Sequence, residues 1–532
     1  MVKTFRESMG GLHIWTGLVF AWLLFFMFIT GTLGYFDTEI DRWMKPELPA
    51  SRVVSAVQSA EAAQRYLEQA HPQAETWFVQ FPVNRATSTL RVHWQYPKNS
   101  GRSREERRGS AWLDLETGQQ LSSRDTGGGQ ALYRMHYRLA YLPHTLAEWL
   151  VGIFSFFMLL ALISGVIIHR NIFRDFFTFR PGKRQRSWLD LHNLSSVASL
   201  PFQLMITYSG LLFFLTTYMP LIVVGSYGFG GDKMNAFIDE IFPRERVEQR
   251  HEVKPMPSLK VLVADAENHW GAGKAGGLEV HWPGDAGAEV HIRGPKEGVT
   301  RNWAERVYDA DGQRVVKAEP DRVPQMTFYS TMLGLHEGTF AGPILRWLYF
   351  SSGLLGAVMV ASGLILWSVK RRARQLKQAR PDRGFMLVER LNAGSLVGLP
   401  IGIAVYFGAN RLLPLAMADR ADWELHLLFI SWLAVLLFAS WRPIRRCWIE
   451  LCGLAALSYL ALPLLNGLTT SKHLLWSLSE QDWAMAAIDL TFLVSGLLFA
   501  LAALQIRRYW KEPAAKRTAS ASPSVPSQEM AV

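Results

Sequence analysis

The chain has 532 residues, of which 49% are hydrophobic, and its formal net charge is +11. The hydrophobic residues gather in stretches of about 20, enough to cross a hydrocarbon core roughly 30 Å thick, which excludes an ordinary soluble domain. Cys447 and Cys452 form no CxxC motif, which excludes thiolate-ligated iron–sulfur clusters and c-type haem attachment. We interpret both as small packing residues.

The apolar stretches predict a polytopic α-helical membrane protein with about eight transmembrane helices. The first stretch is too long for a cleaved signal peptide, and no small-residue cleavage site follows it. We expect spans near residues 13–36, 145–169, 193–224, 342–369, 391–414, 424–441, 447–467 and 485–506. The last four form a C-terminal extension, 391–511, and the Ser- and Pro-rich tail 512–532 is predicted to be disordered.

The positive charge gathers at every second junction between spans. Basic residues precede the first span, fill the loops 170–192 and 370–390, and follow the sixth and eighth spans. The positive-inside rule then places both termini in the cytoplasm and the segments 37–144 and 225–341 outside. The charge therefore indicates membrane topology, and no nucleic-acid partner is expected.

Both outer segments predict a small α+β module of one helix on an antiparallel sheet. The first has helix 51–70 and strands 76–81, 89–96 and 111–115, with a turn at 114–118. The second has helix 258–270 and strands 277–282 and 289–293, with a turn at 306–312. The unit of span, module and span thus occurs twice within residues 1–370.

The spacing of residues supports this internal repeat. From His13 to Gly31 is 18 positions, and from His192 to Gly210 is also 18. At 3.6 residues per turn this is about five turns, so each histidine should lie on the same helix stripe as its glycine. Repeated units that run in the same direction should meet about an axis along the membrane normal.

The second span of each unit matches as well. Trp149 to Gly165 is 16 positions, as is Trp347 to Gly363. Just ahead of these spans, on the outer side, come His136 and His336.

Four histidines therefore occupy matching points of two repeats. If the repeats face each other, His13 and His192 meet at the inner face, and His136 and His336 meet at the outer face. Opposed imidazoles between bundled helices are well suited to ligate b-type haem, so we predict two haems. Zinc is the rival, but it prefers three or four clustered ligands that often include Cys, Asp or Glu.

Neighbouring residues fit the haem hypothesis. Small side chains near the ligands would give a porphyrin room: Gly17, Ser196, Gly338 and Gly342. The second nitrogen of a ligating imidazole usually has a hydrogen-bond partner, for which Asp190 or Asn193 could serve His192.

His169 is harder to assign, because its counterpart in the other repeat is Trp367. It could contact a haem propionate, replace His13 as a ligand, or ligate a further haem. His144 is predicted to be interfacial, and the module histidines to be structural or at the surface: His71, His93, His251, His269, His281 and His291.

Several stretches of sequence also resemble a known family, that of PepSY-associated transmembrane proteins. They are residues 13–17 (HIWTG), 132–136 (LYRMH), 176–183 (FFTFRPGK), 188–193 (WLDLHN) and 335–338 (LHEG). The resemblance covers roughly residues 1–370, and the family includes iron-regulated membrane proteins and ferric-siderophore reductases. It implies PepSY-like modules, haem and an inner-membrane protein that moves electrons outward for iron acquisition.

We therefore expect an oxidoreductase that reduces a ferric siderophore or other ferric chelate in the periplasm. Tryptophans of the modules could line the acceptor site: Trp77, Trp94, Trp112, Trp270, Trp282 and Trp303. No Rossmann fingerprint is present, and the loop 170–191 is too short for a flavin domain, so a quinol or a separate cytoplasmic reductase should donate electrons.

Some alternatives remain open on the sequence. Arg180, Lys183, Arg184 and Arg186 could hold haem propionates, dock an acidic donor, or simply anchor the loop at the membrane surface. The protein could instead be a membrane-anchored PepSY protein that regulates a protease without redox activity, or a permease for iron or siderophore. The role of the extension is not determined by its sequence.

Overall fold

The computed structural model describes most of the chain. The described residues are 4–49, 55–83, 89–103, 105–115, 117–169, 171, 179–180, 185–218, 220–228, 230, 232–233, 235–236, 247–296, 298–316, 324–375, 377–378 and 381–510. The predicted disordered tail and the loop residues Lys183 and Arg184 lie outside them.

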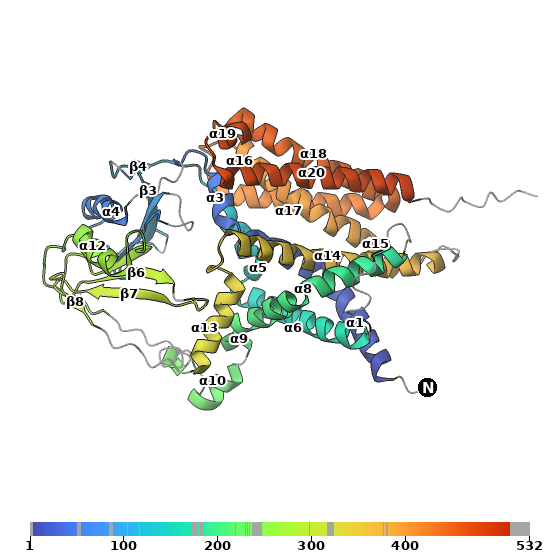
Figure 1. Cartoon of the computed structure of the whole chain (residues 1–532), viewed down its shortest axis with the longest axis horizontal. Coiled ribbons are helices and arrows are strands. Elements are labelled where there is room, and N and C mark those ends of the chain that lie inside the picture. Colours follow the sequence, from blue (N-terminus) through green and yellow to red (C-terminus); the bar gives the residue numbers. More distant parts are fainter. Residues whose placement is uncertain are drawn as a thin grey trace, which may run out of the picture.

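The fold is a helical membrane protein with an antiparallel sheet at one end of the helices, which confirms the predicted fold class (Figure 1). Among the described residues, seven helices are long and apolar enough to span a membrane, or eight if a bent pair counts as one span. They are α6 (His144–Ile168), α8 (Gln185–Phe213), α14 (Pro343–Gln375), α15 with α16 (Arg383–Leu412), α17 (Arg420–Trp441), α18 (Ile444–Thr469) and α20 (Trp483–Tyr509).

The first predicted span is broken into α1 (Phe5–Val19) and α2 (Ala21–Gly34), which meet at an angle of 64°. At the break, the Phe20 ring stacks on Phe157 with centres 4.1 Å apart and meets Phe154 edge-on at 5.0 Å. These contacts with α6 favour the bend. His13 and Gly31 consequently lie on different helices, so the expectation that they share one stripe is wrong.

The third span also differs from its predicted bounds of 193–224. Helix α8 begins at Gln185, two turns before His192, and ends at Phe213. The short helices α9 (Leu215–Tyr218) and α10 (Pro220–Tyr227) follow it. Pro220 is the first residue of α10, a position where its missing amide hydrogen costs no helix hydrogen bond, so a separate helix begins there.

The strands of the two modules join into one eight-stranded sheet of order β4-β3-β2-β1-β5-β6-β7-β8. The central pair is antiparallel, with Thr76 opposite His281 and Gln80 opposite Gly277. The sequence predicted a separate sheet within each module, and in the structure the two sheets pair to form one. The strands are β1 (Thr76–Gln80), β2 (Leu90–Gln95), β3 (Arg108–Leu113), β4 (Gln120–Leu121), β5 (Gly277–His281), β6 (Glu289–Lys296), β7 (Trp303–Tyr308) and β8 (Arg314–Val315).

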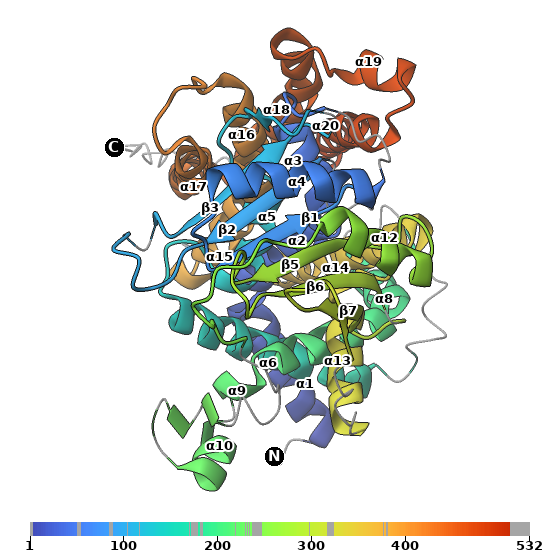
Figure 2. The same cartoon turned by 90° about the vertical axis from the view of Figure 1, so that its left-hand side faces the viewer.

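Two helices, α4 (Ala56–Ala70) and α12 (Leu259–Trp270), lie across one face of this sheet (Figure 2). Alternate strand residues point to them, including the buried Trp77, Val79 and Val280. This period of two is typical of a sheet with one covered face. We call the end of the membrane helices next to the sheet the sheet side, and the other end the far side.

Three shorter helices connect the sheet with the spans. Helix α3 (Asp37–Met44) follows α2, α5 (Gly128–Arg138) precedes α6, and α13 (Pro324–Glu337) precedes α14. The extension comprises α15 (Arg383–Leu396), α16 (Gly398–Leu412), α17, α18, α19 (Leu474–Ser479) and α20, and packs beside α2 and α3 (Figure 1). Cys447 and Cys452 are buried in its core.

Candidate functional site

The four repeat-matched histidines come together as two pairs. In the far pair, the ring centres of His13 on α1 and His192 on α8 are 6.2 Å apart, with 70° between the ring planes. In the sheet-side pair, His136 on α5 and His336 on α13 are also 6.2 Å apart, with 41° between planes. Each pair draws one histidine from each repeat, as the sequence predicted.

A second helix orients each imidazole of the far pair. His13 Nδ1 lies 2.9 Å from the Ala161 carbonyl oxygen of α6. His192 Nδ1 lies 2.8 Å from the Met359 carbonyl oxygen of α14. The two acceptors are 198 positions apart, the same offset as Trp149 and Trp347, so the repeat includes the supports as well as the histidines.

The sheet-side pair is held in the same way. His136 Nδ1 lies 2.8 Å from the Met27 carbonyl oxygen of α2. His336 forms a hydrogen bond with the backbone of Ile206 on α8, and its Nδ1 lies 2.9 Å from Ser209 Oγ. Met27 and Ile206 are 179 positions apart, which is also the separation of His13 and His192.

A glycine backs every one of the four rings, four positions after the supporting residue. A Cβ atom would lie 2.6 Å from His136 at Gly31, 3.1 Å from His336 at Gly210, and 3.2 Å from His13 at Gly165 and from His192 at Gly363. The four glycines that marked the repeat in the sequence therefore each make room for one imidazole. The structure assigns Gly31 to His136, where stripe reasoning had grouped it with His13.

These contacts determine which ring nitrogen is available. A carbonyl oxygen only accepts hydrogen bonds, so Nδ1 of each supported ring carries the proton and Nε2 keeps its lone pair. No described residue forms a hydrogen bond with Nε2 of any of the four. An imidazole held in this way is well prepared to bind a metal through Nε2.

The spacing within each pair fits two imidazoles on opposite sides of one metal ion. A metal–nitrogen bond of about 2 Å on each side, plus about 1.1 Å from each nitrogen to its ring centre, would separate the centres by about 6 Å. Both pairs meet this requirement at 6.2 Å. Among the described residues, no group of three or more His, Cys, Asp or Glu side chains could hold a metal ion, so no zinc-type cluster is present there.

Of the four residues expected to leave room for a porphyrin, two face open space and two make other contacts. A Cβ atom at Gly17 or Gly342 would meet nothing within 4 Å, so the space beside both is open. Ser196 turns its hydroxyl to the His192 carbonyl oxygen at 2.5 Å. Gly338 ends α13 with a φ of +61° and faces Tyr349, so it serves a turn.

The predicted partners of His192 are engaged elsewhere. Arg180 donates to both carboxylate oxygens of Asp190, each at 2.9 Å, and Asn193 Nδ2 lies 3.0 Å from His169 Nε2. The Met359 carbonyl oxygen takes the place that the sequence had given to Asp190 or Asn193. A backbone acceptor on a distant helix leaves no signal in the local sequence, which is why it was missed.

The fifth candidate, His169, lies at the C-terminal end of α6. Its Nε2 lies 3.0 Å from Nδ2 of Asn193, the residue that follows His192 in the chain. His144, predicted to be interfacial, is half exposed and lies 3.1 Å from Glu148. Of the six module tryptophans, Trp77 is buried and Trp303 is the most exposed, at 42%.

The two pairs lie near opposite ends of the membrane helices. His192 and Ile206, which supports His336, are fourteen positions apart on the continuous helix α8. At 1.5 Å per residue this is roughly 21 Å along the helix. The separation is shorter than the hydrocarbon thickness of about 30 Å.

A group of buried polar side chains in the extension was missed by sequence reasoning. Arg420 and Glu424 are fully buried and form an ion pair at 2.5 Å. Asn410 donates to Glu424 at 2.8 Å, and Tyr406 is also fully buried. We call Tyr406, Asn410, Arg420 and Glu424 the clamp. The (i, i+4) charges at the start of an apolar span were the signal that could have revealed it.

The clamp holds the linker that precedes α5. Glu424 accepts a hydrogen bond from Thr126 Oγ1 at 2.5 Å, and Arg420 donates to the Asp125 carbonyl oxygen at 2.8 Å. Tyr406 donates to the Gly128 carbonyl oxygen at 2.8 Å. The extension therefore anchors the start of the helix that carries His136.

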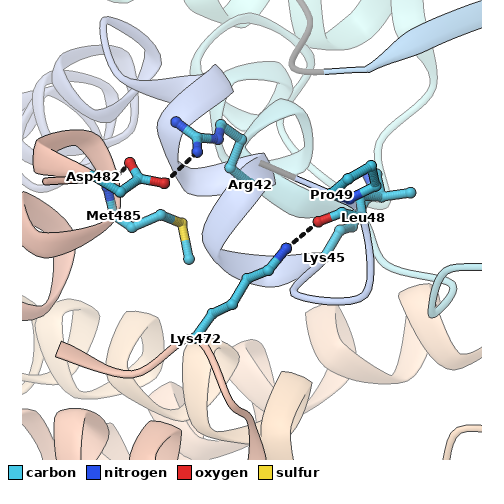
Figure 3. Close-up of a pocket in the computed structure, with 7 residues that line it drawn as sticks. All are labelled: Arg42, Lys45, Leu48, Pro49, Lys472, Asp482 and Met485. Carbon is cyan, nitrogen blue, oxygen red and sulfur yellow. Dashed lines mark hydrogen bonds and ion pairs between the residues drawn. The ribbon is translucent and has the colours of Figure 1, made fainter. Parts of the chain in front are cut away.

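A small cavity between α3 and the extension is lined by three cations: Arg42, Lys45 and Lys472 (Figure 3). Its volume of about 10 Å³ suits at most one water molecule. Arg42 pairs with Asp482 at 2.5 Å, and Lys472 donates to the Leu48 carbonyl oxygen. These contacts make the cavity part of an interface, and it is too small for a ligand.

Comparison with known proteins agrees with the architecture. The family described as PepSY-associated TM region matches residues 11–370. A relative from Pseudomonas aeruginosa, the uncharacterized protein PA4219, is 26% identical over 379 residues, which cover 68% of this chain and 90% of the relative.

Proposed function

We propose that this chain, which belongs to the PepSY-associated TM region family of membrane proteins, binds two b-type haems and transfers electrons across the membrane to a ferric siderophore or other ferric chelate. The proposal makes it a transmembrane ferric reductase of the bacterial inner membrane. The chelate is its substrate, and iron acquisition is its role.

One observation carries the proposal: two imidazole pairs have the same ring separation and the same repeated supports. A structural histidine at a helix end needs neither an opposed partner nor a second helix that holds its Nδ1. Four such rings, each backed by a glycine, are hard to explain by packing alone.

The residues of the chain would orient the ligating imidazoles and fix the position of the ring proton. Each supporting carbonyl would hold the ring proton on Nδ1 and so leave the Nε2 lone pair free for a metal. When bound, haem iron accepts and releases single electrons. The apolar helices around both pairs would exclude water from them, and the separation along α8 would divide the crossing into shorter steps.

Direction follows from the charge distribution. The basic junctions lie at the far side, which we assign to the cytoplasm, and the sheet then lies in the periplasm. The acceptor would react near His136 and His336, and the donor, a quinol or a cytoplasmic reductase, near His13 and His192. Reduction of Fe(III) to Fe(II) weakens its binding by hard oxygen ligands and would release the metal.

An absorption spectrum and a haem count test the proposal. The purified full-length protein should show a Soret band, an α band that sharpens on reduction with dithionite, and two haems per chain. His192→Ala should remove the far-side haem and His336→Ala the sheet-side haem, so each variant should keep one. His144→Ala is the matched control and should keep two, because His144 pairs only with Glu148 among the described contacts.

Two results would contradict the proposal. A colourless protein from haem-replete cells would favour a permease or a protease-regulating protein. Full haem content in both the His192 and the His336 variants would show that the ligands were assigned wrongly. His169→Ala tests the remaining candidate, and we expect it to keep both haems.

A further inference from the structure

The hairpin between β6 and β7 reaches α13 close to His336. The Arg301 amide donates to Ser330 Oγ at 2.9 Å, and that hydroxyl donates to Asn302 Oδ1 at 3.2 Å. Gly334 lies against the backbone carbonyl of Val299, where a Cβ atom would collide with it. The absence of a side chain at Gly334 thus lets the hairpin lie directly on the helix that carries the ligand.

This contact brings a guanidinium group next to the sheet-side pair. The Arg301 guanidinium pairs with Glu337, the neighbour of His336, at 3.0 Å. It also lies 5.7 Å from the ring centre of Phe213, which in turn is 5.1 Å from the His336 ring. Arg301 and His336 therefore both lie next to the Phe213 ring.

A second cation, Lys296, lies at the same place. Its ammonium group donates to the neutral hydroxyl of Thr339 and lies 5.8 Å from the Trp303 ring centre. Burial lowers the pKa of Lys296, while the charge of Glu337 acts in the opposite direction. Both cations, Lys296 and Arg301, act on the one carboxylate of Glu337.

The Arg301 guanidinium is more exposed than the carboxylate that it pairs with. The Arg301 side chain is 52% exposed, whereas that of Glu337 is 16% exposed. Trp303, the most exposed of the module tryptophans, stands beside Lys296. We call Lys296, Arg301 and Trp303 the cationic lip. A guanidinium, an ammonium and a flat aromatic surface together favour planar, anionic oxygen groups.

We infer that the cationic lip binds the carboxylate groups of a ligand at the sheet-side pair. This rests on the proposed function, and two sources could supply the carboxylates: the propionates of a haem held by His136 and His336, or an anionic ferric chelate that arrives from the sheet side. The lip then selects for anionic chelates over neutral ones, or it anchors the cofactor.

The first repeat provides a control for this inference. Lys98 is the counterpart of Lys296, 198 positions earlier, on the hairpin between β2 and β3. It lines a separate cavity of about 270 Å³ together with Gln95, Tyr96, Arg107 and Arg108. No described contact joins Lys98 to either histidine of the sheet-side pair.

The experiment compares Lys296→Gln and Arg301→Gln with Lys98→Gln in the full-length protein. Gallium(III) citrate serves as a redox-inert anionic probe, and its binding is measured by calorimetry in both haem-loaded and haem-free protein. Haem per chain and the two reduction potentials are measured in parallel. Arg301→Lys keeps a positive charge beside Glu337, so it can replace Arg301→Gln if that variant does not fold.

If the lip holds the chelate, Lys296→Gln lowers the affinity for gallium citrate about tenfold, with both haems retained and Lys98→Gln unchanged. If it holds a propionate, citrate binding stays the same, and the sheet-side haem is lost or its potential shifts. Unchanged citrate affinity, haem content and potentials in both lip variants would overturn the inference. Citrate binding to a protein that never takes up haem would instead refute the proposed function alone.

Discussion

Helices α5 and α13 carry equivalent histidines in the two repeats, but different segments of the chain hold them in place. Each carries one histidine of the sheet-side pair, and each histidine meets a carbonyl and a glycine at repeat-matched positions. Helix α5, however, starts from a linker that the clamp of the extension holds, whereas α13 lies under the β6–β7 hairpin.

This difference indicates which part of the repeat is constrained. The imidazole, its carbonyl and its glycine must keep one geometry, since all of them determine where Nε2 points. The surroundings only need to hold the helix still, so a clamp on one side and a hairpin on the other serve equally well. The molecule is symmetric at its histidines and asymmetric around them.

The largest effect should come from the clamp, which supports the start of α5 and, among the described residues, does not contact α13. Glu424→Ala leaves Arg420 as an unpaired, fully buried charge and frees the linker at Thr126. We expect a loss of about 3–5 kcal/mol in the free energy of unfolding, and the haem proposed for the sheet-side pair should be disturbed before the one proposed for the far pair. Denaturant unfolding in detergent, followed by circular dichroism and by haem absorbance, measures both.

Glu450→Ala is the matched control for the clamp variant, because Glu450 also pairs with an arginine of the extension, Arg442, but at an exposed site. It should change the unfolding free energy little. An equal loss in the two variants would contradict the role given to the clamp.

A smaller effect should distinguish the two glycines of the sheet-side pair. A Cβ atom at Gly31 would lie 2.6 Å from His136, so the ring must move, whereas at Gly210 it would lie 3.1 Å from His336, where a slight shift suffices. Gly31→Ala should therefore cost about 1–3 kcal/mol in the free energy of unfolding and displace the haem that we propose at the sheet-side pair, and Gly210→Ala should cost less. Haem counts and unfolding midpoints of the two variants test this order, and the reverse order would refute it.

The smallest effect concerns two equivalent histidines of the sheet, His93 and His291. Burial, with a further contribution from Arg91, lowers the pKa of His93 to about 4. His291 has carboxylates beside it instead, Glu289 at 3.0 Å and Glu305 at 3.2 Å. As the pH falls from 6.5 towards 4, the unfolded chain takes up a proton at His93 that the folded chain does not, so stability should decrease over this range.

His93→Gln should remove part of that acid sensitivity, and His291→Gln should leave it in place. The melting temperature of the full-length protein, measured between pH 7.5 and 4.5, provides the comparison. Identical pH profiles for wild type and His93→Gln would rule out this explanation.

Much of the architecture could be predicted because its signals are local. Apolar stretches of membrane length predicted the spans, and alternation predicted strands such as β1 and β5 to within a residue or two. Equal spacings between histidines and glycines predicted that His13 and His192, and His136 and His336, would meet. The break at Phe20 could not be predicted, because the Phe157 ring that it stacks on lies far away in the sequence.

The sequence by itself therefore predicted which four histidines would form two pairs, and the structure brings those pairs together. Only the tertiary structure decided how they are held. In it the Met359 carbonyl oxygen, and neither Asp190 nor Asn193, bonds the Nδ1 of His192. Gly31 lies against His136, and β1 and β5 join the two modules into one sheet. Periodicity reports the face of an element, but the identity of its neighbour depends on contacts between segments far apart in the chain.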